Sequence, residues 1–94
     1  MARGVAVSVH YGDRVFYADV DPGERADQLL VRSLYHFGID PGDKHRYRLI
    51  RRGAHRPAHG LYLDRPIGDQ VESGAELAVE EDQPENRRLA TGTY

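Results

Sequence analysis

One stretch of this 94-residue sequence repeats apolar residues with the period of an α-helix, and it constrains the fold more than any other feature. The repeating positions are Ala26, Leu30, Leu34 and Phe37, with Leu29 beside them. Spacings of three and four residues place these side chains on one face of a helix. Gly38 follows directly and predicts a left-handed helix stop. No second stretch has this period, so strands and turns must supply the rest of the core.

Alternating apolar and polar residues predict strands on both sides of the helix. Residues 5–9 and 15–20 alternate in this way around the turn sequence YGDR, which predicts a β-hairpin. After the helix, the turn-rich segment IDPGDKH leads into a third strand in RYRLIRRG. LYLD predicts a short fourth strand, and AELAVEE predicts a last strand with Leu77 and Val79 on one face. The expected order is strand, strand, helix, strand, short strand, strand.

The remaining segments are turns, a loop and a tail. In RPIGDQVESG, Ile67 and Val71 are expected to point into the core, and AHRPAHG is expected to form a mobile loop. The polar segment 82–94 has no apolar period, which predicts a flexible tail. A chain of this length supports one core, so we expect one domain over residues 1–81 followed by the tail.

Composition narrows the classes of function. The formal net charge is −2 and the isoelectric point is about 6.2, which give no electrostatic reason to expect a nucleic-acid partner. The absence of cysteine excludes disulfides, thiolate metal sites and cysteine nucleophiles, and it fits a reducing compartment. The chain shows no resemblance to a signal peptide and no apolar run of membrane-spanning length. We therefore expect a cytoplasmic protein without a membrane partner. Arginine outnumbers lysine twelve to one, with Lys44 the only lysine, and this bias suggests a bacterium with a GC-rich genome.

The histidines and serines do not form a recognisable catalytic pattern. They lack a glycine-flanked nucleophile, a phosphate-binding loop or a carboxylate pair, so we predict neither an enzyme nor a cofactor. His55 and His59 stand four residues apart, a spacing that would bring them together on a helix. Pro57 and the bounding glycines argue against a helix there, so solvated loop histidines are expected and no metal site.

The order and intervals of these elements resemble the ubiquitin-like β-grasp family over roughly residues 5–81. The hairpin leads into the helix through VDPGE, FGIDPGDKHRYRLIRRG contains a helix stop, a proline turn and a strand, and LYLDRPIGDQVESGAEL precedes the last strand. The resemblance implies an α+β fold in which a mixed sheet of four or five strands packs on one main helix. A ferredoxin-like or other α+β sandwich is the alternative, but it would usually need a second helix.

Within the resemblance, the third strand is the expected partner-binding site. The segment RLIRRGAHR concentrates four arginines, Arg48, Arg51, Arg52 and Arg56. A basic recognition face and a solvated strand edge both fit this pattern. Ile50 stands where ubiquitin presents an exposed isoleucine to its readers, so Ile50 with Arg48, Arg51 and Arg52 forms the expected site. Glu80 replaces the expected apolar partner of that isoleucine, which implies a mixed charged and apolar surface.

The chain ends in RRLATGTY, which resembles the basic and apolar tail of ubiquitin-like modifiers. Such tails close on glycine, because narrow enzyme clefts exclude a Cβ atom and need a permissive backbone. The resemblance implies conjugation through Gly92 after removal of Thr93 and Tyr94. It also implies recognition of the tail through three residues, Arg87, Arg88 and Leu89. Ubiquitin and the sulfur carriers have two terminal glycines where this tail has one.

The resemblance is greatest to bacterial ubiquitin-like modifiers, which implies three partner enzymes: a processing protease, an adenylating enzyme and a conjugating enzyme. A noncovalent adaptor domain and a sulfur carrier stay open as alternatives, although the Thr-Tyr extension counts against the carrier. Because Lys44 is the only lysine, self-conjugation through an isopeptide bond would use Lys44 or the amino terminus.

Overall fold

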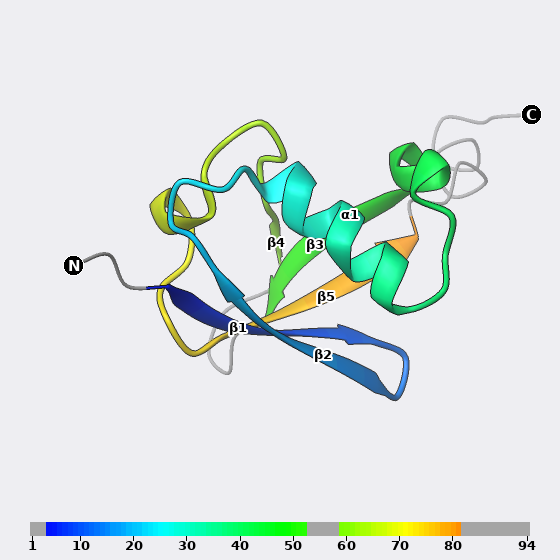
Figure 1. The fold of residues 1–94 in the computed structure, drawn as a ribbon, viewed down its shortest axis with the longest axis horizontal. Coiled ribbons are helices and arrows are strands. Elements are labelled where there is room, and N and C mark those ends of the chain that lie inside the picture. Colours follow the sequence, from blue (N-terminus) through cyan, green and yellow to red (C-terminus); the bar gives the residue numbers. More distant parts are fainter. Residues whose placement is uncertain (1–3, 53–58, 82–94) are drawn as a thin grey trace, which may run out of the picture.

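A computed structural model describes residues 4–52 and 59–81 (Figure 1). The elements in chain order are β1 (Val5–Tyr11), β2 (Arg14–Val20), α1 (Ala26–His36), the 3₁₀ helix η1 (Pro41–Arg46), β3 (Tyr47–Arg52), β4 (His59–Gly60), the 3₁₀ helix η2 (Ile67–Asp69) and β5 (Ala75–Glu81). The predicted order of strands and helix is confirmed. Helix α1 is too short to cross a membrane, and so is every other helix in these residues.

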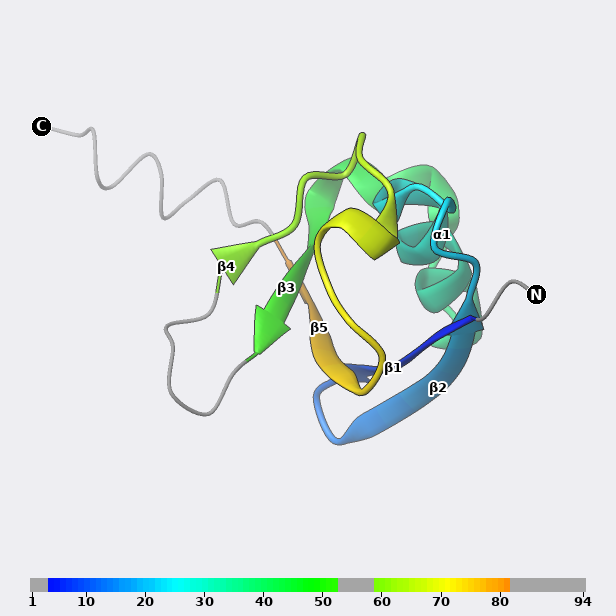
Figure 2. The ribbon, with the colours of Figure 1, turned by 90° about the vertical axis from the view of Figure 1, so that its left-hand side faces the viewer.

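The five strands form one mixed sheet in the order β2-β1-β5-β3-β4. Only the central pair, β1 and β5, is parallel; β1 pairs with β2, and β3 with β4 and β5, in antiparallel fashion. Helix α1 lies across one face of the curved sheet (Figures 1 and 2). The first and last strands of the described chain therefore meet at the centre of the sheet.

The core lies between α1 and the sheet, where the sequence pattern predicted it. From α1 it takes Leu29, Leu30 and Leu34, which are fully buried. Alternate residues of the strands face these leucines, as the period-2 pattern predicted: Val5, Val7 and Val9 of β1, Ala18 and Val20 of β2, Leu49 of β3, and Leu77 and Val79 of β5. The predicted inward positions of Ile67 and Val71 are confirmed as well.

The end of α1 is fixed by local and long-range contacts. Gly38 has φ +80°, the left-handed conformation that ends helices, and the amide of Ile39 donates to the carbonyl of Leu34 (2.8 Å). Arg14, beside the β1–β2 turn, donates to the carbonyl of Phe37 (3.1 Å) and lies 5.4 Å from the centre of its ring. The predicted glycine stop is thus confirmed, and the hairpin turn braces it.

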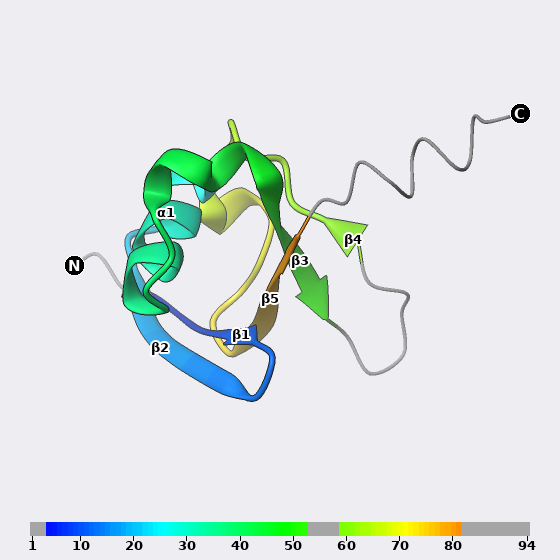
Figure 3. The same ribbon diagram turned by 90° about the vertical axis from the view of Figure 1, so that its right-hand side faces the viewer.

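The fourth strand differs from its prediction. It comprises His59–Gly60, whereas the sequence LYLD predicted a strand at 61–64. Of that predicted strand, only Leu61 continues the pairing with β3: its amide donates to the carbonyl of Leu49 (2.9 Å). Beyond it the chain bends toward α1. The first-turn amides of Ala26 and Asp27 donate to the carbonyls of Arg65 and Leu63, each at 2.9 Å. Figure 3 shows this chain segment and η2, in yellow-green and yellow, beside the start of α1. The predicted strand is short because its backbone completes the helix end instead.

The connection after α1 differs from its prediction, and the predicted loop and tail lie largely outside the described residues. The connection IDPGDKH is a 3₁₀ helix rather than a plain turn, begun by Pro41 and by the Asp40 carboxylate, which accepts from the amide of Gly42 (2.9 Å). The loop expected at AHRPAHG lies mostly outside the described residues, and so does the predicted tail over 82–94. The last strand, β5, ends at Glu81.

Candidate partner-binding surface

The side of the sheet that faces away from α1 carries most of the candidate binding residues. We call it the outer face. Because Val7, Ala18, Leu49 and Leu77 point into the core, strand alternation places their neighbours on the outer face. These are Ala6 and Ser8 of β1, Tyr17 and Asp19 of β2, Glu76, Ala78 and Glu80 of β5, and Arg48, Ile50 and Arg52 of β3.

Ile50 lies on this face as predicted, but it is not exposed. Only 4% of it is accessible to solvent, so the expected exposed isoleucine is wrong. Ile50 lies inside the sheet, on β3 between β5 and β4. Ala78 lies opposite Ile50 on one side and Gly60 on the other, while Arg48 and Arg52 flank it along its own strand. Ile50 is therefore a buried residue of the sheet in this structure, and its role in partner binding stays a prediction.

The arginines of β3 do not form one basic cluster. Arg48 and Arg52 are exposed on the outer face, whereas Arg51 is half-buried and points to the side of Leu49. The register places Glu80 opposite Arg48 and Glu76 opposite Arg52, and opposite charges at such positions attract. Glu80 is thus the neighbour of an arginine and not of Ile50. The surface is mixed in charge, and Arg56 lies outside the described residues.

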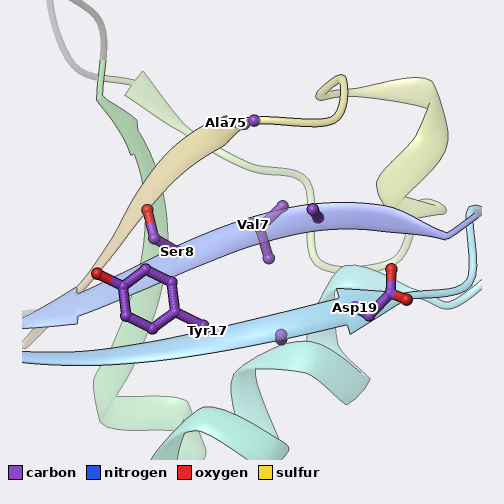
Figure 4. A pocket seen from close by; sticks show the side chains of 8 residues that line it. Val7, Ser8, Tyr17, Asp19 and Ala75 are labelled. Atoms are coloured by element: carbon purple, nitrogen blue, oxygen red, sulfur yellow. The ribbon is translucent and has the colours of Figure 1, made fainter.

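A hollow opens on the outer face over β1, β2 and the start of β5 (Figure 4). Its volume is about 450 Å³, and most of its lining is small: Ala6, Val7, Ser8, Ala18, Gly74 and Ala75. Tyr17 and Asp19 are the large side chains that border it, and Figure 4 shows them on the same stretch of β2. Tyr17 is 79% exposed, which is unusual for so large an aromatic side chain. No local pattern in the sequence indicated this site.

Lys44, the predicted self-conjugation acceptor, lies in η1 and is exposed. It borders a second groove, of about 470 Å³, between η1 and α1, whose other lining residues are Glu24, Asp27, Gln28, Val31 and Arg32. The carboxylate of Glu24 pairs with Arg32 at 2.8 Å, and that of Asp27 pairs with Arg25 at 3.0 Å. The amine of Lys44 is accessible, and its role as an acceptor stays a prediction.

Tyr47 gives the domain a testable response to alkaline pH. Burial raises the pKa of Tyr47 above its ordinary value of 10.0, and the neighbouring Tyr11 and Glu81 raise it further. Because the unfolded chain releases this proton first, stability from Tyr47 is present below about pH 10 and is lost as the pH rises through the folded-state pKa. We expect the free energy of unfolding to fall less steeply above about pH 10 in Tyr47→Phe than in the wild type. Urea unfolding of both proteins across this range measures the slopes, and equal slopes would contradict the assignment.

The remaining predicted sites fall largely outside the described residues. These are the proposed conjugation residue Gly92, the removed residues Thr93 and Tyr94, the recognition residues Arg87, Arg88 and Leu89, and His55. His59 belongs to β4, and His36 stacks on Phe16 with ring centres 4.4 Å apart. Residues 4–52 and 59–81 hold no group of three His, Asp or Glu side chains arranged to bind a metal ion.

Comparisons with known proteins identify the fold. No family model and no curated protein matches the sequence. The ubiquitin-like domain of an Arabidopsis thaliana protein matches with a TM-score of 0.67 and 18% identity, over 86% of this chain and 80% of that one. The C-terminal ubiquitin-like domain of mouse tubulin-specific chaperone e gives 0.68 and 12%, over 88% and 91%. A protein designed de novo on the basis of ubiquitin gives 0.65 and 16%, over 83% and 88%. The chain is therefore an α+β protein with the ubiquitin-like β-grasp fold.

Proposed function

We propose that this protein is a ubiquitin-like modifier that is joined to its target through Gly92. The observation that supports this proposal is the position of β5, the last strand of the described residues, relative to Gly92. The last strand, β5, closes the centre of the sheet and ends at Glu81. The sequence NRRLATG then leads to Gly92. Eleven residues, 82 to 92, span up to about 36 Å when fully extended, enough to enter the cleft of an enzyme that docks on the domain.

The proposed chemistry takes place on partner enzymes. A protease removes Thr93 and Tyr94, which leaves the carboxylate of Gly92 at the terminus. An adenylating enzyme joins this carboxylate to the α-phosphate of ATP, which gives an acyl adenylate and releases pyrophosphate. This activation is needed because a free carboxylate does not acylate an amine at a useful rate. With a conjugating enzyme, the acyl group then passes to an amine of the target: an amide bond forms, the acyl–phosphate bond breaks, and AMP and a proton are released. In this scheme the domain is a substrate and a recognition element, in keeping with ubiquitin-like domains, which are generally non-catalytic.

Intact-mass analysis of the protein from its native host tests this proposal. We expect a species shortened by Thr-Tyr and larger conjugated species. Gly92→Val should abolish the conjugates, because its branched side chain obstructs a narrow cleft, whereas deletion of Thr93 and Tyr94 should preserve them. Equal thermal midpoints of Gly92→Val and the wild type would show that the domain itself is intact. A tail that stays whole, without conjugates, would contradict the proposal.

A noncovalent adaptor domain is the second candidate, and the exposed Tyr17 beside a hollow favours it. Some of the similar structures are ubiquitin-like domains of larger proteins, such as the one in tubulin-specific chaperone e. In this case residues 1–81 alone should retain partner binding. A sulfur carrier, the third candidate, would instead show a terminal thiocarboxylate in the same mass analysis.

A further inference from the structure

We propose that the hollow beside Tyr17 and Asp19 binds an arginine side chain from a basic segment of a partner protein. The proposal concerns the outer face of the sheet and does not depend on conjugation through Gly92. Its basis is the combination of a small, fixed floor with one aromatic and one acidic border.

The floor is held in place by hydrogen bonds between β1 and the turn that precedes β5. The amide of Gly74 donates to the carbonyl of Ala6 (2.7 Å), and the amide of Ala6 donates to the hydroxyl of Ser73 (3.1 Å). Gly74 has φ +94°, a conformation that side-chain-bearing residues rarely adopt. Ala6 adds only a methyl group to the floor, and Ala75, which belongs to the core cluster, borders the hollow without a bulky outward side chain. An unbranched aliphatic chain can therefore lie across it.

The two border residues match the positive charge and the paired hydrogen-bond donors of a guanidinium group. Tyr17 and Asp19 are two residues apart on β2, so their Cα atoms are about 7 Å apart and both side chains stand on the outer face. An exposed tyrosine ring attracts a cation placed over it. A carboxylate accepts two parallel hydrogen bonds from arginine. In Figure 4 the ring of Tyr17 lies near Ser8 and the carboxylate of Asp19 lies farther along the hollow.

The charges around the hollow favour a cation over other ligands. Asp19 is the charged residue of the lining, and Glu76 lies opposite Ser8 on the neighbouring strand. Within residues 4–52 and 59–81, the ion pairs found are Arg25–Asp27 and Arg32–Glu24, so no described cation pairs with Asp19. An anionic ligand would meet the carboxylate of Asp19 here, whereas Glu76 does not line the hollow and lies opposite Arg52. A single bordering carboxylate is too few ligands for a metal ion, which leaves a cation with an apolar stem as the best match.

The experiment is an NMR titration of the full-length protein with a capped peptide, Ala-Leu-Arg-Leu-Ala. We expect chemical-shift changes at Ala6, Ser8, Tyr17, Asp19 and Gly74. The same peptide with citrulline in place of arginine keeps the shape and loses the charge, so it should bind at least about tenfold more weakly. The lysine peptide should bind more weakly than the arginine peptide, because an ammonium group does not make the bidentate contact.

Variants of the protein separate this site from other surfaces. Asp19→Asn should weaken binding about tenfold and Tyr17→Ala by about threefold or more. Tyr35→Ala, which removes an equally exposed tyrosine from α1, should leave the affinity unchanged, as should Gly92→Val. Matching amide spectra away from the hollow would show that each variant is folded. Equal affinity of Asp19→Asn, equal binding of the citrulline peptide, or shifts confined to the groove beside Lys44 would each overturn the proposal.

Discussion

Ile50→Ala is expected to lower the free energy of unfolding by about 2 to 4 kcal/mol, the usual cost of removing a buried aliphatic side chain. Ile50 is only 4% exposed and lies between Ala78 and Gly60 on the neighbouring strands. Truncation removes apolar surface that the fold buries, and the surrounding structure relaxes only in part into the space left behind. Urea unfolding followed by circular dichroism measures the effect as a shift of the midpoint.

The matched control for Ile50 is a large apolar residue that the fold does not bury. Tyr35→Ala removes a side chain that is 77% exposed, so its effect should stay within about 0.5 kcal/mol. If Ile50→Ala were as mild as Tyr35→Ala, Ile50 would be accessible in solution. The original expectation of an exposed docking residue would then regain support.

Gly68→Ala is expected to destabilise the domain by about 1 to 3 kcal/mol, the typical cost of overpacking. An added Cβ atom at Gly68 would lie 2.7 Å from the Cβ and 3.0 Å from the carbonyl oxygen of Pro22. The amide of Gly68 donates to that same carbonyl (2.9 Å). The methyl group therefore cannot be accommodated without separating η2 from the loop before α1. Thermal or urea unfolding gives the change directly.

Gly23→Ala is the control for Gly68, because it lies in the same loop as Pro22 and has room for a side chain. The nearest atom to an added Cβ is a carboxylate oxygen of Asp21 at 3.6 Å, an ordinary contact. We expect its free energy of unfolding to be unchanged or raised by up to about 1 kcal/mol, since alanine restricts the unfolded chain. A Gly68→Ala protein as stable as Gly23→Ala would show that η2 is not held tightly against this loop.

The sequence was sufficient for features that depend on local pattern. The period of α1, its stop at Gly38 and the inward face of each long strand follow from residues close together in the chain. Alternation even assigned Ile50 to the correct face of the sheet. Its burial was not predictable in the same way, because burial depends on tertiary contacts that the pattern of one strand does not contain.

Features that need distant segments were missed for the same reason. The pairing of Arg48 with Glu80 depends on a register between strands about thirty residues apart. The hollow combines Ala6 and Tyr17 with Gly74, which no local pattern brings together. The fourth strand was misplaced because Leu63 and Arg65 give their carbonyls to the start of α1. Tertiary hydrogen bonding overrode the local strand preference there.

The position of β5 at the centre of the sheet has a consequence for how the chain folds during its synthesis. Of the strands in residues 4–52 and 59–81, β5 is the last to be synthesised, yet it joins the β1–β2 hairpin to the β3–β4 pair. Until it emerges, the nascent chain holds two sheet fragments whose inner edges lack their partner, and such edges attract strands of other chains. The bonds that β5 makes with β1 also span almost the whole domain, and contacts of such sequence separation form slowly. A newly made copy is thus most vulnerable to aggregation just before β5, which ends at Glu81, has emerged completely.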